Sequence, residues 1–281
     1  MESRDCYRFE ERKYNDGIFS KKRNLINATY IIHLVGNGRL TKINSELNKI
    51  HPTNQLWILH NKGYRVCHKD NIDNPSDDLV ECYYQVFRHA AAHGYENILV
   101  LEDDFFFDET FHEDPMIIDS ISDFMIAKKN TDYMYLFGCL PLLQIPIGDH
   151  RRSLSLATHA CIYSKKCRDR ILLSDQQTIG DWDVWHNLHT KKYIFYKPLC
   201  YQLFPHTENQ QGWLSNYLPK FIQSFLLLYL IYPFLQGLAL DRSIHPGYPF
   251  FYTFSEGVSY LMIVLLIYIL YRIFMKIYHR K

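Results

Sequence analysis

Three adjacent carboxylates stand at the end of an apolar run. Residues 98–110 read ILVLEDDFFFDET, so Glu102, Asp103 and Asp104 directly follow four apolar residues. Three neighbouring negative charges repel one another unless a cation or a cationic side chain lies among them. Carboxylate oxygens suit Mg²⁺ and Mn²⁺, which often also bind substrate phosphates. A divalent ion on a diphosphate would therefore explain the triplet. A solvated acidic loop, or capping of a following helix, would explain it without a ligand.

The segments that must position the triplet alternate between strand-like and helical patterns. Strand candidates rich in β-branched and aromatic residues are LINATYIIHL (25–34), QLWILH (55–60), ENILVLEDD (96–104) and DYMYLFG (132–138). Strands that alternate with helices predict an α/β domain with a largely parallel sheet. In such sheets ligands bind beyond the carboxyl ends of the strands, which is where the triplet is expected.

The best-marked helix is predicted from about Leu79 to His93. Asp78 and Glu81 resemble a capping box at its start, and Gly94 supplies a stop at its end. Apolar residues at helical spacing predict its buried face: Leu79, Cys82, Val86 and Ala90.

The segments around the triplet resemble the lipopolysaccharide-type glycosyltransferases of family 25. In that family a helix ending in Ala/His-rich residues precedes a Gly-Tyr turn and an apolar strand that closes in Glu-Asp-Asp. Here ECYYQVFRHAAA leads into HGYENILVLEDDFFF in the same way. Further segments follow in the family's order: TYIIHL (29–34), YMYLFG (133–138), THACIYSKKCRDRILL (158–173, with Ser164 as a helix cap), GDWDVWH (180–186) and YKPLCYQLFPHTENQQGW (196–213).

The resemblance covers about residues 25–215 and has specific implications. It implies a GT-A fold, the Rossmann-like mixed sheet of nucleotide-diphospho-sugar transferases. It also implies transfer of a sugar from a nucleotide-sugar donor, typically with Mn²⁺ or the similar Mg²⁺.

The resemblance assigns roles within the triplet, which matches the family's variant of the Asp-x-Asp motif. Asp104 is the best candidate for a metal ligand, and Glu102 is the second. Asp103 would contact the ribose of the donor or orient the site.

Two residues near position 200 complete the implied site. His206 lies just past the Pro198 to Gln202 segment, where many GT-A enzymes supply a further metal ligand. A neutral imidazole suits Mn²⁺, although the chain has 14 histidines and a single one is more often structural. Gln202 matches the family's closing glutamine and could fix the loop beside the metal.

Asp181 and Asp183 flank Trp182 and match the family's second acidic site. On an extended chain both carboxylates would point the same way. If transfer inverts the anomeric centre, one of them would take the proton of the acceptor hydroxyl. Alternatively, the pair caps a helical segment at 184–188. Trp182 or Trp185 could stack on the acceptor sugar, although tryptophan is more often buried.

The first loop departs from the family pattern. The family's first strand usually ends in Asn-Leu, followed by a charged pair and an arginine, whereas here His33 and Leu34 precede VGNGR. Arg39 is still expected to reach the donor diphosphate, but the identity of the nucleotide stays open. Gly36-Asn37-Gly38 is too short for a dinucleotide fingerprint and favours a turn.

Two apolar runs near the C-terminus predict a membrane anchor over residues 216–281. Residues 221–240 contain no charge, and residues 257–275 contain only Arg272, close enough to the end to reach the headgroups. Tyrosines flank the runs as an interfacial belt would: Tyr217, Tyr248, Tyr252, Tyr271 and Tyr278. We expect a transmembrane helical hairpin. The alternatives are a buried hairpin in a soluble core, or a first run that lies in the interface or re-enters.

Charge predicts the orientation of that anchor. The tail carries Arg272, Lys276, Arg280 and Lys281, whereas the loop between the runs carries only Arg242, so the C-terminus is expected in the cytosol. Two crossings would place the catalytic domain in the cytosol too. Residues 1–24 are a charged extension without the apolar core of a signal peptide. Seven cysteines without a CxxC spacing are expected to be reduced.

The sequence therefore predicts a membrane-anchored, metal-dependent glycosyltransferase with a nucleotide-sugar donor and a glycan, lipid-linked or glycoprotein acceptor. Of its 281 residues 22% are charged, and the net charge is +1. Because no basic stripe is interleaved with aromatic residues, nucleic acid is not expected as a partner. The alternatives are a non-catalytic nucleotide- or glycan-binding membrane protein with a degenerate GT-A fold, and a metal-dependent phosphohydrolase.

Overall fold

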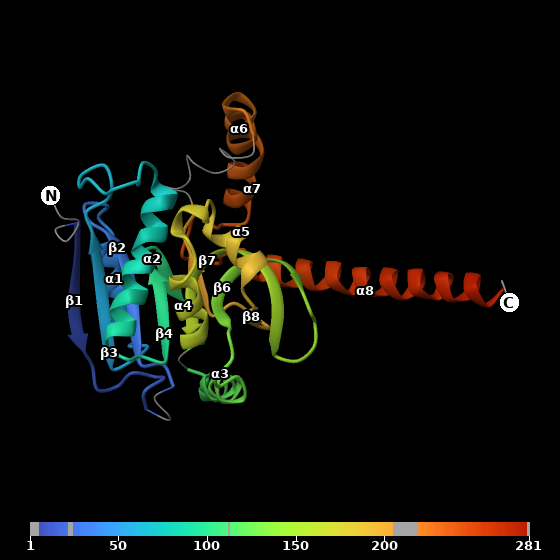
Figure 1. The fold of residues 1–281 in the computed structure, drawn as a ribbon, viewed down its shortest axis with the longest axis horizontal. Helices are drawn as coiled ribbons and strands as arrows, with labels where there is room; N and C mark the ends of the chain where they lie inside the picture. Colours follow the sequence, from blue (N-terminus) through green and yellow to red (C-terminus); the bar gives the residue numbers. More distant parts are fainter. Residues whose placement is uncertain (1–5, 22–24, 112, 205–217, 280–281) are drawn as a thin grey trace.

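The computed structural model describes residues 6–21, 25–111, 113–204 and 218–279, and its body is built on a mixed seven-stranded sheet (Figure 1). In spatial order the strands are β1 (Tyr7–Lys13), β3 (Gln55–Asn61), β2 (Ala28–Leu34), β4 (Asn97–Glu102), β7 (His150–Ser164), β6 (Met134–Gln144) and β8 (Lys192–Phe195). The centre, β3-β2-β4, is parallel, and β7 runs antiparallel to β4 and β6. The expected α/β layout with a largely parallel sheet is confirmed, because β3, β2, β4, β6 and β8 run in one direction and only β1 and β7 oppose them.

Helices cover both faces of the sheet, so that the body has three layers. The helices are α1 (Leu40–Lys49), α2 (Pro75–Ala92), α3 (Pro115–Ala127), α4 (Lys165–Leu172) and α5 (Trp182–His189), with a short 3₁₀ turn η2 (Gln176–Thr178). Along β4, Leu99 and Leu101 belong to the core under α1 and α3, whereas Ile98 and Val100 belong to the core under α2, α4 and α5. This alternation is the two-residue period of a strand buried on both faces.

The N-terminal segment contributes an edge strand. Residues 1–24 were expected to precede the domain, but β1 pairs antiparallel with β3 along its whole length, from Tyr7 opposite Asn61 to Lys13 opposite Gln55. An edge strand has one neighbour and one exposed flank, so it tolerates the charged residues that made this segment look like an extension.

Helix α2 begins earlier than predicted. Its N-cap is Asn74, whose side chain accepts a hydrogen bond from the Asp77 N–H at 2.9 Å. Asp78 is instead buried and pairs with Lys69, so the predicted capping box is wrong. The stop is confirmed, because Gly94 adopts a φ of +68°, in the left-handed region that ends helices.

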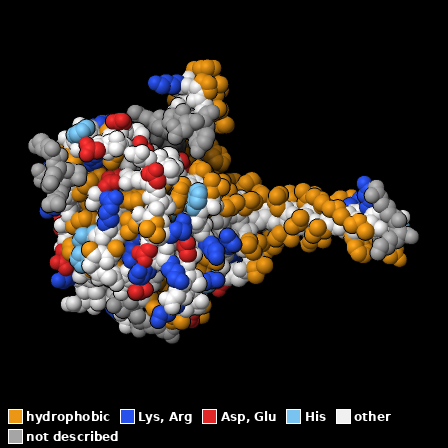
Figure 2. All heavy atoms as spheres, viewed as in Figure 1, with side chains coloured by type: hydrophobic (Ala, Val, Ile, Leu, Met, Phe, Trp, Pro, Cys, Tyr) orange, Lys and Arg blue, Asp and Glu red, His pale blue; other side chains and the backbone are white. Residues whose placement is uncertain are grey.

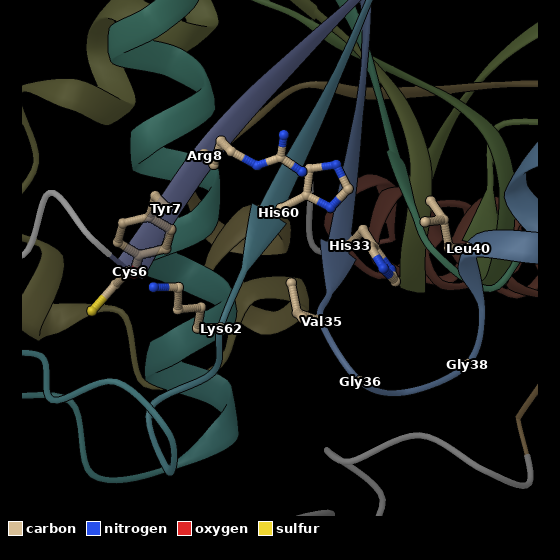
Figure 3. Close-up of a pocket in the computed structure, with 10 residues that line it drawn as sticks. All are labelled: Cys6, Tyr7, Arg8, His33, Val35, Gly36, Gly38, Leu40, His60 and Lys62. Carbon is tan, nitrogen blue, oxygen red and sulfur yellow. The ribbon is translucent and has the colours of Figure 1, made fainter.

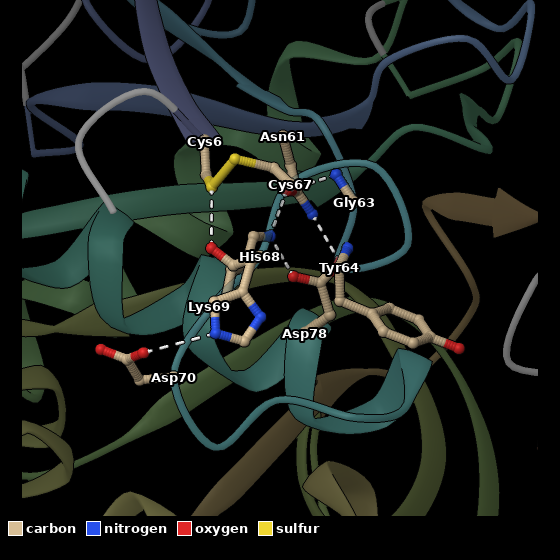
Figure 4. The surroundings of a disulfide bond; sticks show 9 residues. All are labelled: Cys6, Asn61, Gly63, Tyr64, Cys67, His68, Lys69, Asp70 and Asp78. Atoms are coloured by element: carbon tan, nitrogen blue, oxygen red, sulfur yellow. Dashed lines mark hydrogen bonds and ion pairs between the residues drawn. A yellow bond between two sulfur atoms is a disulfide. The ribbon is translucent and has the colours of Figure 1, made fainter. Parts of the chain in front are cut away.

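The cysteine prediction is wrong for one pair. Cys6 and Cys67 form a disulfide that ties the start of β1 to the loop after β3, as Figure 4 shows. Below it, Lys69 is 3% exposed and donates to Asn61 Oδ1 at 2.5 Å and to Asp78. The other five cysteines are free thiols, and all of them are buried.

The C-terminal part contains two helical units that leave the body in different directions (Figure 1). The first is continuous through α6 (Lys220–Leu226), the π-helical turn η4 (Leu227–Ile231) and α7 (Tyr232–Gly237). The second is α8 (Tyr248–Tyr278), the one helix among the described residues that is long and apolar enough to cross a membrane. In Figure 2 hydrophobic side chains cover both units. Among the described residues one of the two expected spanning helices meets the length and composition required to cross a membrane, so the expected hairpin is not confirmed.

Candidate active site

The acidic triplet lies at the carboxyl end of the central strand β4, as predicted. Glu102 is the last residue of β4 and lies opposite Ile32 of β2, so the triplet faces the loop that follows β2. Asp103 and Asp104 form the turn into β5 (Phe105–Phe107), which pairs antiparallel with β9 (Cys200–Gln202) in a separate two-stranded sheet.

Asp103 joins the triplet to the loop after β2. Its carboxylate accepts hydrogen bonds from the Leu34 N–H at 2.9 Å, from Asn37 Nδ2 at 2.6 Å and from Arg39 at 2.7 Å, and His33 Nδ1 lies 3.3 Å away. Burial alone would raise the pKa of Asp103, but the His33 contact, the Arg39 charge and the Leu34 N–H outweigh it and lower the pKa. Asp103 is therefore an ionised anchor for this loop.

Asp104 has an oxygen to which no described residue donates a hydrogen bond. Its Oδ2 accepts from Arg39 and from Gln202 Nε2, each at 3.2 Å. Its Oδ1 is buried and has no hydrogen-bond partner among the described residues. Burial, followed by the charge of Asp103, raises the pKa of Asp104 to about 6. A buried carboxylate oxygen without a donor is costly unless a ligand binds it.

Glu102 lies beside Asp104 and shares its excess of negative charge. Its Oε1 accepts from the Tyr83 hydroxyl at 3.0 Å, and Gln202 Nε2 lies 3.5 Å from Oε2. Loss of solvent, then the charges of Asp104 and Asp183, raise the pKa of Glu102 well above its usual value. Arg39 is thus one cationic partner of the triplet, and the charge of Lys42 also acts on Asp104.

The carboxylates fit a divalent ion in donor type and charge. No group of three His, Cys, Asp or Glu side chains that could hold a metal occurs among the residues described here. Mg²⁺ and Mn²⁺ need no such group, because one or two carboxylates, waters and substrate phosphates can complete their coordination. The free Oδ1 of Asp104 and the carboxylate of Glu102 beside it could be these one or two protein ligands. The predicted ligand His206 lies outside the described residues.

Gln202 reaches the triplet because β9 is held on both sides. Phe105 of β5 lies opposite Gln202, which places its amide beside Asp104. On the other side the Gln202 N–H donates to the Tyr248 hydroxyl at 3.1 Å, at the first residue of α8. Gly138 allows the approach of β9 to β6, because a Cβ there would lie 1.9 Å from the Cys200 carbonyl oxygen.

The second acidic pair lies on a helix rather than on an extended chain, so the predicted common direction of the two carboxylates is wrong. Asp181 is the N-cap of α5 and accepts from the Val184 N–H at 2.9 Å. Asp183, the second residue of α5, accepts from the Ala157 N–H at 2.6 Å and from the Thr158 N–H and hydroxyl. Ala157 has a φ of +57°, so Asp183 supports a strained bend in β7.

The charge of Asp183 nevertheless contributes to the raised pKa of Glu102. Trp182 is buried against Tyr83, with ring centroids 4.5 Å apart, so it packs in the core.

A cavity of about 810 Å³ opens beside the loop that Asp103 holds (Figure 3). It is lined by the ends of β1, β2 and β3 and by the Gly36 to Gly38 loop. Its polar lining is largely cationic or imidazole: Arg8, His33, His60 and Lys62. His33 lines the cavity and also contacts Asp103, so the cavity and the acidic turn are neighbours.

Several residues of this site were not predicted. Asn37 lies in the loop that departed from the family pattern, His33 lies at the end of β2 before that loop, and Tyr83 was assigned only to a helix. Tyr248 was expected in a membrane belt, and no local pattern links it to Gln202, 46 positions away.

The fold and the site define a three-layer α/β protein with an acidic centre at the carboxyl end of its central strand. No family model matches the sequence, and no curated protein matches it. Among solved structures, a glycosyltransferase involved in the glycosylation of the major capsid of PBCV-1 is similar at 10% identity and a TM-score of 0.38, covering 65% of this chain and 96% of that one. Mannose-1-phosphate geranyltransferase from Thermus thermophilus is similar at 8% identity and a TM-score of 0.32, covering 60% and 72%.

Proposed function

We propose that the protein is a glycosyltransferase that moves a sugar from a nucleotide-sugar donor to an acceptor hydroxyl, with a divalent ion held by Asp104 and Glu102. The observation that carries the proposal is the buried, unused Oδ1 of Asp104 at the carboxyl end of the central strand. The ordered segments that resemble family 25 support the same reaction, and membership of that family remains a prediction.

The donor would lie across the loop that Asp103 holds. The cavity of about 810 Å³ has room for a nucleoside, and Arg8 and Lys62 complement phosphate charge. From there the diphosphate would extend over Gly36 and Gly38 towards Asp104. A divalent ion bound there would stabilise the negative charge that develops on the leaving diphosphate. Arg39 would hold the two aspartates in place and add positive charge.

In the transfer step the acceptor oxygen bonds to the anomeric carbon, and the bond from that carbon to the diphosphate breaks. The diphosphate takes the electron pair, and a carboxylate takes the hydroxyl proton. For an inverting reaction we propose Asp183 for that proton because its charge acts on Glu102, although its two oxygens also accept hydrogen bonds from Ala157 and Thr158. Asp183→Asn should then lower turnover by about 100-fold with donor binding retained, and Asp181→Asn should not. Equal turnover in both variants would contradict this assignment.

We propose that α8 attaches the protein to a membrane and that the acceptor is a glycan on a lipid or protein near it. If α8 crosses the membrane once, the cations Arg272 and Lys276 near its end favour a cytosolic C-terminus. The body then lies on the opposite side of the membrane. The Cys6–Cys67 disulfide agrees with an oxidising compartment. The prediction from the sequence placed the body in the cytosol because it assumed that the chain crosses the membrane twice. Among the described residues one helix is long and apolar enough to cross.

The direct test is a screen of sugar nucleotides with Mn²⁺ or Mg²⁺ and glycan acceptors, measuring the released nucleoside diphosphate. We expect one donor to release diphosphate when metal and acceptor are present, and Asp104→Asn to abolish the release. Glu109→Gln, at an exposed carboxylate five positions further on, is the matched control. Equal release without any acceptor would favour a phosphohydrolase. The absence of binding and turnover with every nucleotide would favour the non-catalytic alternative.

A further inference from the structure

Helix α8 is divided into a packed part and a free part. Tyr248, Tyr252, Ser255 and Ser259 are buried against the body. From Tyr260 to Tyr278 no residue is buried. These 19 residues make a helix of about 28 Å, close to the thickness of the hydrocarbon core of a bilayer. The edge of the bilayer is therefore expected next to Ser259.

The hairpin between β6 and β7 ends at the same level. The Gln144 N–H donates to Ser259 Oγ at 2.9 Å, and Gln144 Nε2 donates to Ser255 Oγ at 2.9 Å. After the turn, Arg151 pairs with Glu256 at 3.0 Å. The tip between Gln144 and Arg151 thus lies beside the last packed turn of α8.

This tip carries apolar side chains that nothing in the described body covers. Ile145 is 49% exposed and Ile147 is 74% exposed. Scattered exposed apolar residues are ordinary, but these two lie beside a helix long enough to cross a membrane. The tip also contains Gly148 and the exposed Asp149, which suit the depth of the headgroups better than the hydrocarbon.

We propose that the β6–β7 tip is a second membrane-contact site, with Ile145 and Ile147 inserted into the interfacial layer of the bilayer beside α8. One helix leaves the body free to turn about its axis. A second contact away from that axis fixes which face of the body meets the lipid. The proposal depends on α8 crossing a membrane and is independent of the glycosyltransferase reaction.

The test uses the full chain in lipid nanodiscs with an environment-sensitive fluorophore on Ile147→Cys. Because the five free thiols are buried and the other two cysteines are paired, the introduced thiol is the reactive one, and unsubstituted protein gives the background. The matched control is Leu173→Cys, at a residue that is 88% exposed just after α4. We expect blue-shifted emission at position 147, quenched by lipids labelled near the headgroup more than by lipids labelled at the chain end. Position 173 should be quenched by aqueous iodide.

Three results would overturn the proposal. The first is iodide quenching at position 147 equal to that at position 173. The second is stronger quenching by the deep label, which would place the tip within the hydrocarbon. The third is protection from iodide and from both labelled lipids, which would indicate a contact with a second copy of the chain.

Discussion

At the residue scale, Arg39 touches both aspartates of the triplet, at 2.7 Å from Asp103 and 3.2 Å from Asp104. Arg39→Ala leaves two buried carboxylates without their cation, which should lower the free energy of unfolding by about 3 kcal/mol. Mn²⁺ should restore part of that loss, because it supplies the missing charge. Thermal or urea unfolding with and without Mn²⁺ measures both effects. Arg88→Ala, at an exposed pair with Glu81, is the control. An identical Mn²⁺ response in wild type and Arg39→Ala would contradict this account.

His159 provides a pH-dependent test at the same scale. It is fully buried, and burial lowers its pKa from 6.5 to about 4. Between these values the unfolded chain binds a proton that the folded chain does not, so stability should fall as the pH drops from 6.5 towards 4. The shift corresponds to about 3 kcal/mol for this group. Urea unfolding against pH should give a shallower slope for His159→Gln than for wild type. Equal slopes in His159→Gln and wild type would refute the prediction.

The residue types of the site could be predicted, whereas their partners could not. The acidic triplet and Gln202 were recognisable because short segments carry them. The contacts of Arg39 with two carboxylates could not be predicted, because they depend on the conformation of the loop after β2. Asp103 holds that loop through Leu34 and Asn37. Contacts of this kind join positions more than 60 residues apart, and no local spacing encodes them.

At the element scale, β9 depends on one glycine in β6. A Cβ at Gly138 would lie 1.9 Å from the Cys200 carbonyl oxygen and 2.7 Å from His159 Nε2, so backbone must move. Gly138→Ala should lower the free energy of unfolding by about 1–3 kcal/mol or more and displace Gln202 from Asp104. At Gly257, in the helix α8, an added Cβ would meet no atom of the surrounding structure within 4 Å. Gly257→Ala should therefore leave the stability unchanged or raise it. Chemical denaturation measures both variants. Equal stability of Gly138→Ala and wild type would contradict the packing described.

Elements with strong local patterns were predicted, and elements that depend on neighbours were not. The apolar runs that became β2, β3, β4 and β6 were all found, as was the Ser164 cap of α4. The edge strand β1 was missed because five of its seven residues are charged, including the consecutive run Glu10 to Lys13. The run at 221–240 was expected to be one spanning helix. It contains a π-helical turn and ends at Gly237, and its Leu235 packs in a core with Phe106 and Tyr201.

At the scale of the whole molecule, the disulfide and the one membrane-length helix of the described residues are both consistent with the topology proposed above. The bond between Cys6 and Cys67 closes a loop with a sequence separation of 61. Its loss should lower the free energy of unfolding by about 4 kcal/mol at most. The double variant Cys6→Ser/Cys67→Ser, unfolded beside wild type with and without reductant, measures this. If the unfolding midpoint of wild type did not change when reductant was added, the predicted contribution of the disulfide would be contradicted.

The same topology can be tested in sealed membrane vesicles. If the body lies opposite the cytosolic tail, added protease should remove the C-terminal tail and leave the body intact until detergent is added. Digestion of the body in intact vesicles oriented with their cytosolic side outward would restore the orientation predicted from sequence.

The central claim is that the acidic turn holds a divalent ion against the diphosphate of an activated sugar. Calorimetric titration of Mn²⁺ and nucleoside diphosphates into wild type, Asp104→Asn and Glu109→Gln tests it most directly. We expect at least one nucleoside diphosphate to bind only when Mn²⁺ is present, with Asp104→Asn weakened by about 100-fold and Glu109→Gln unchanged. Equal affinity in Asp104→Asn and wild type, or binding that ignores the metal, would contradict the account.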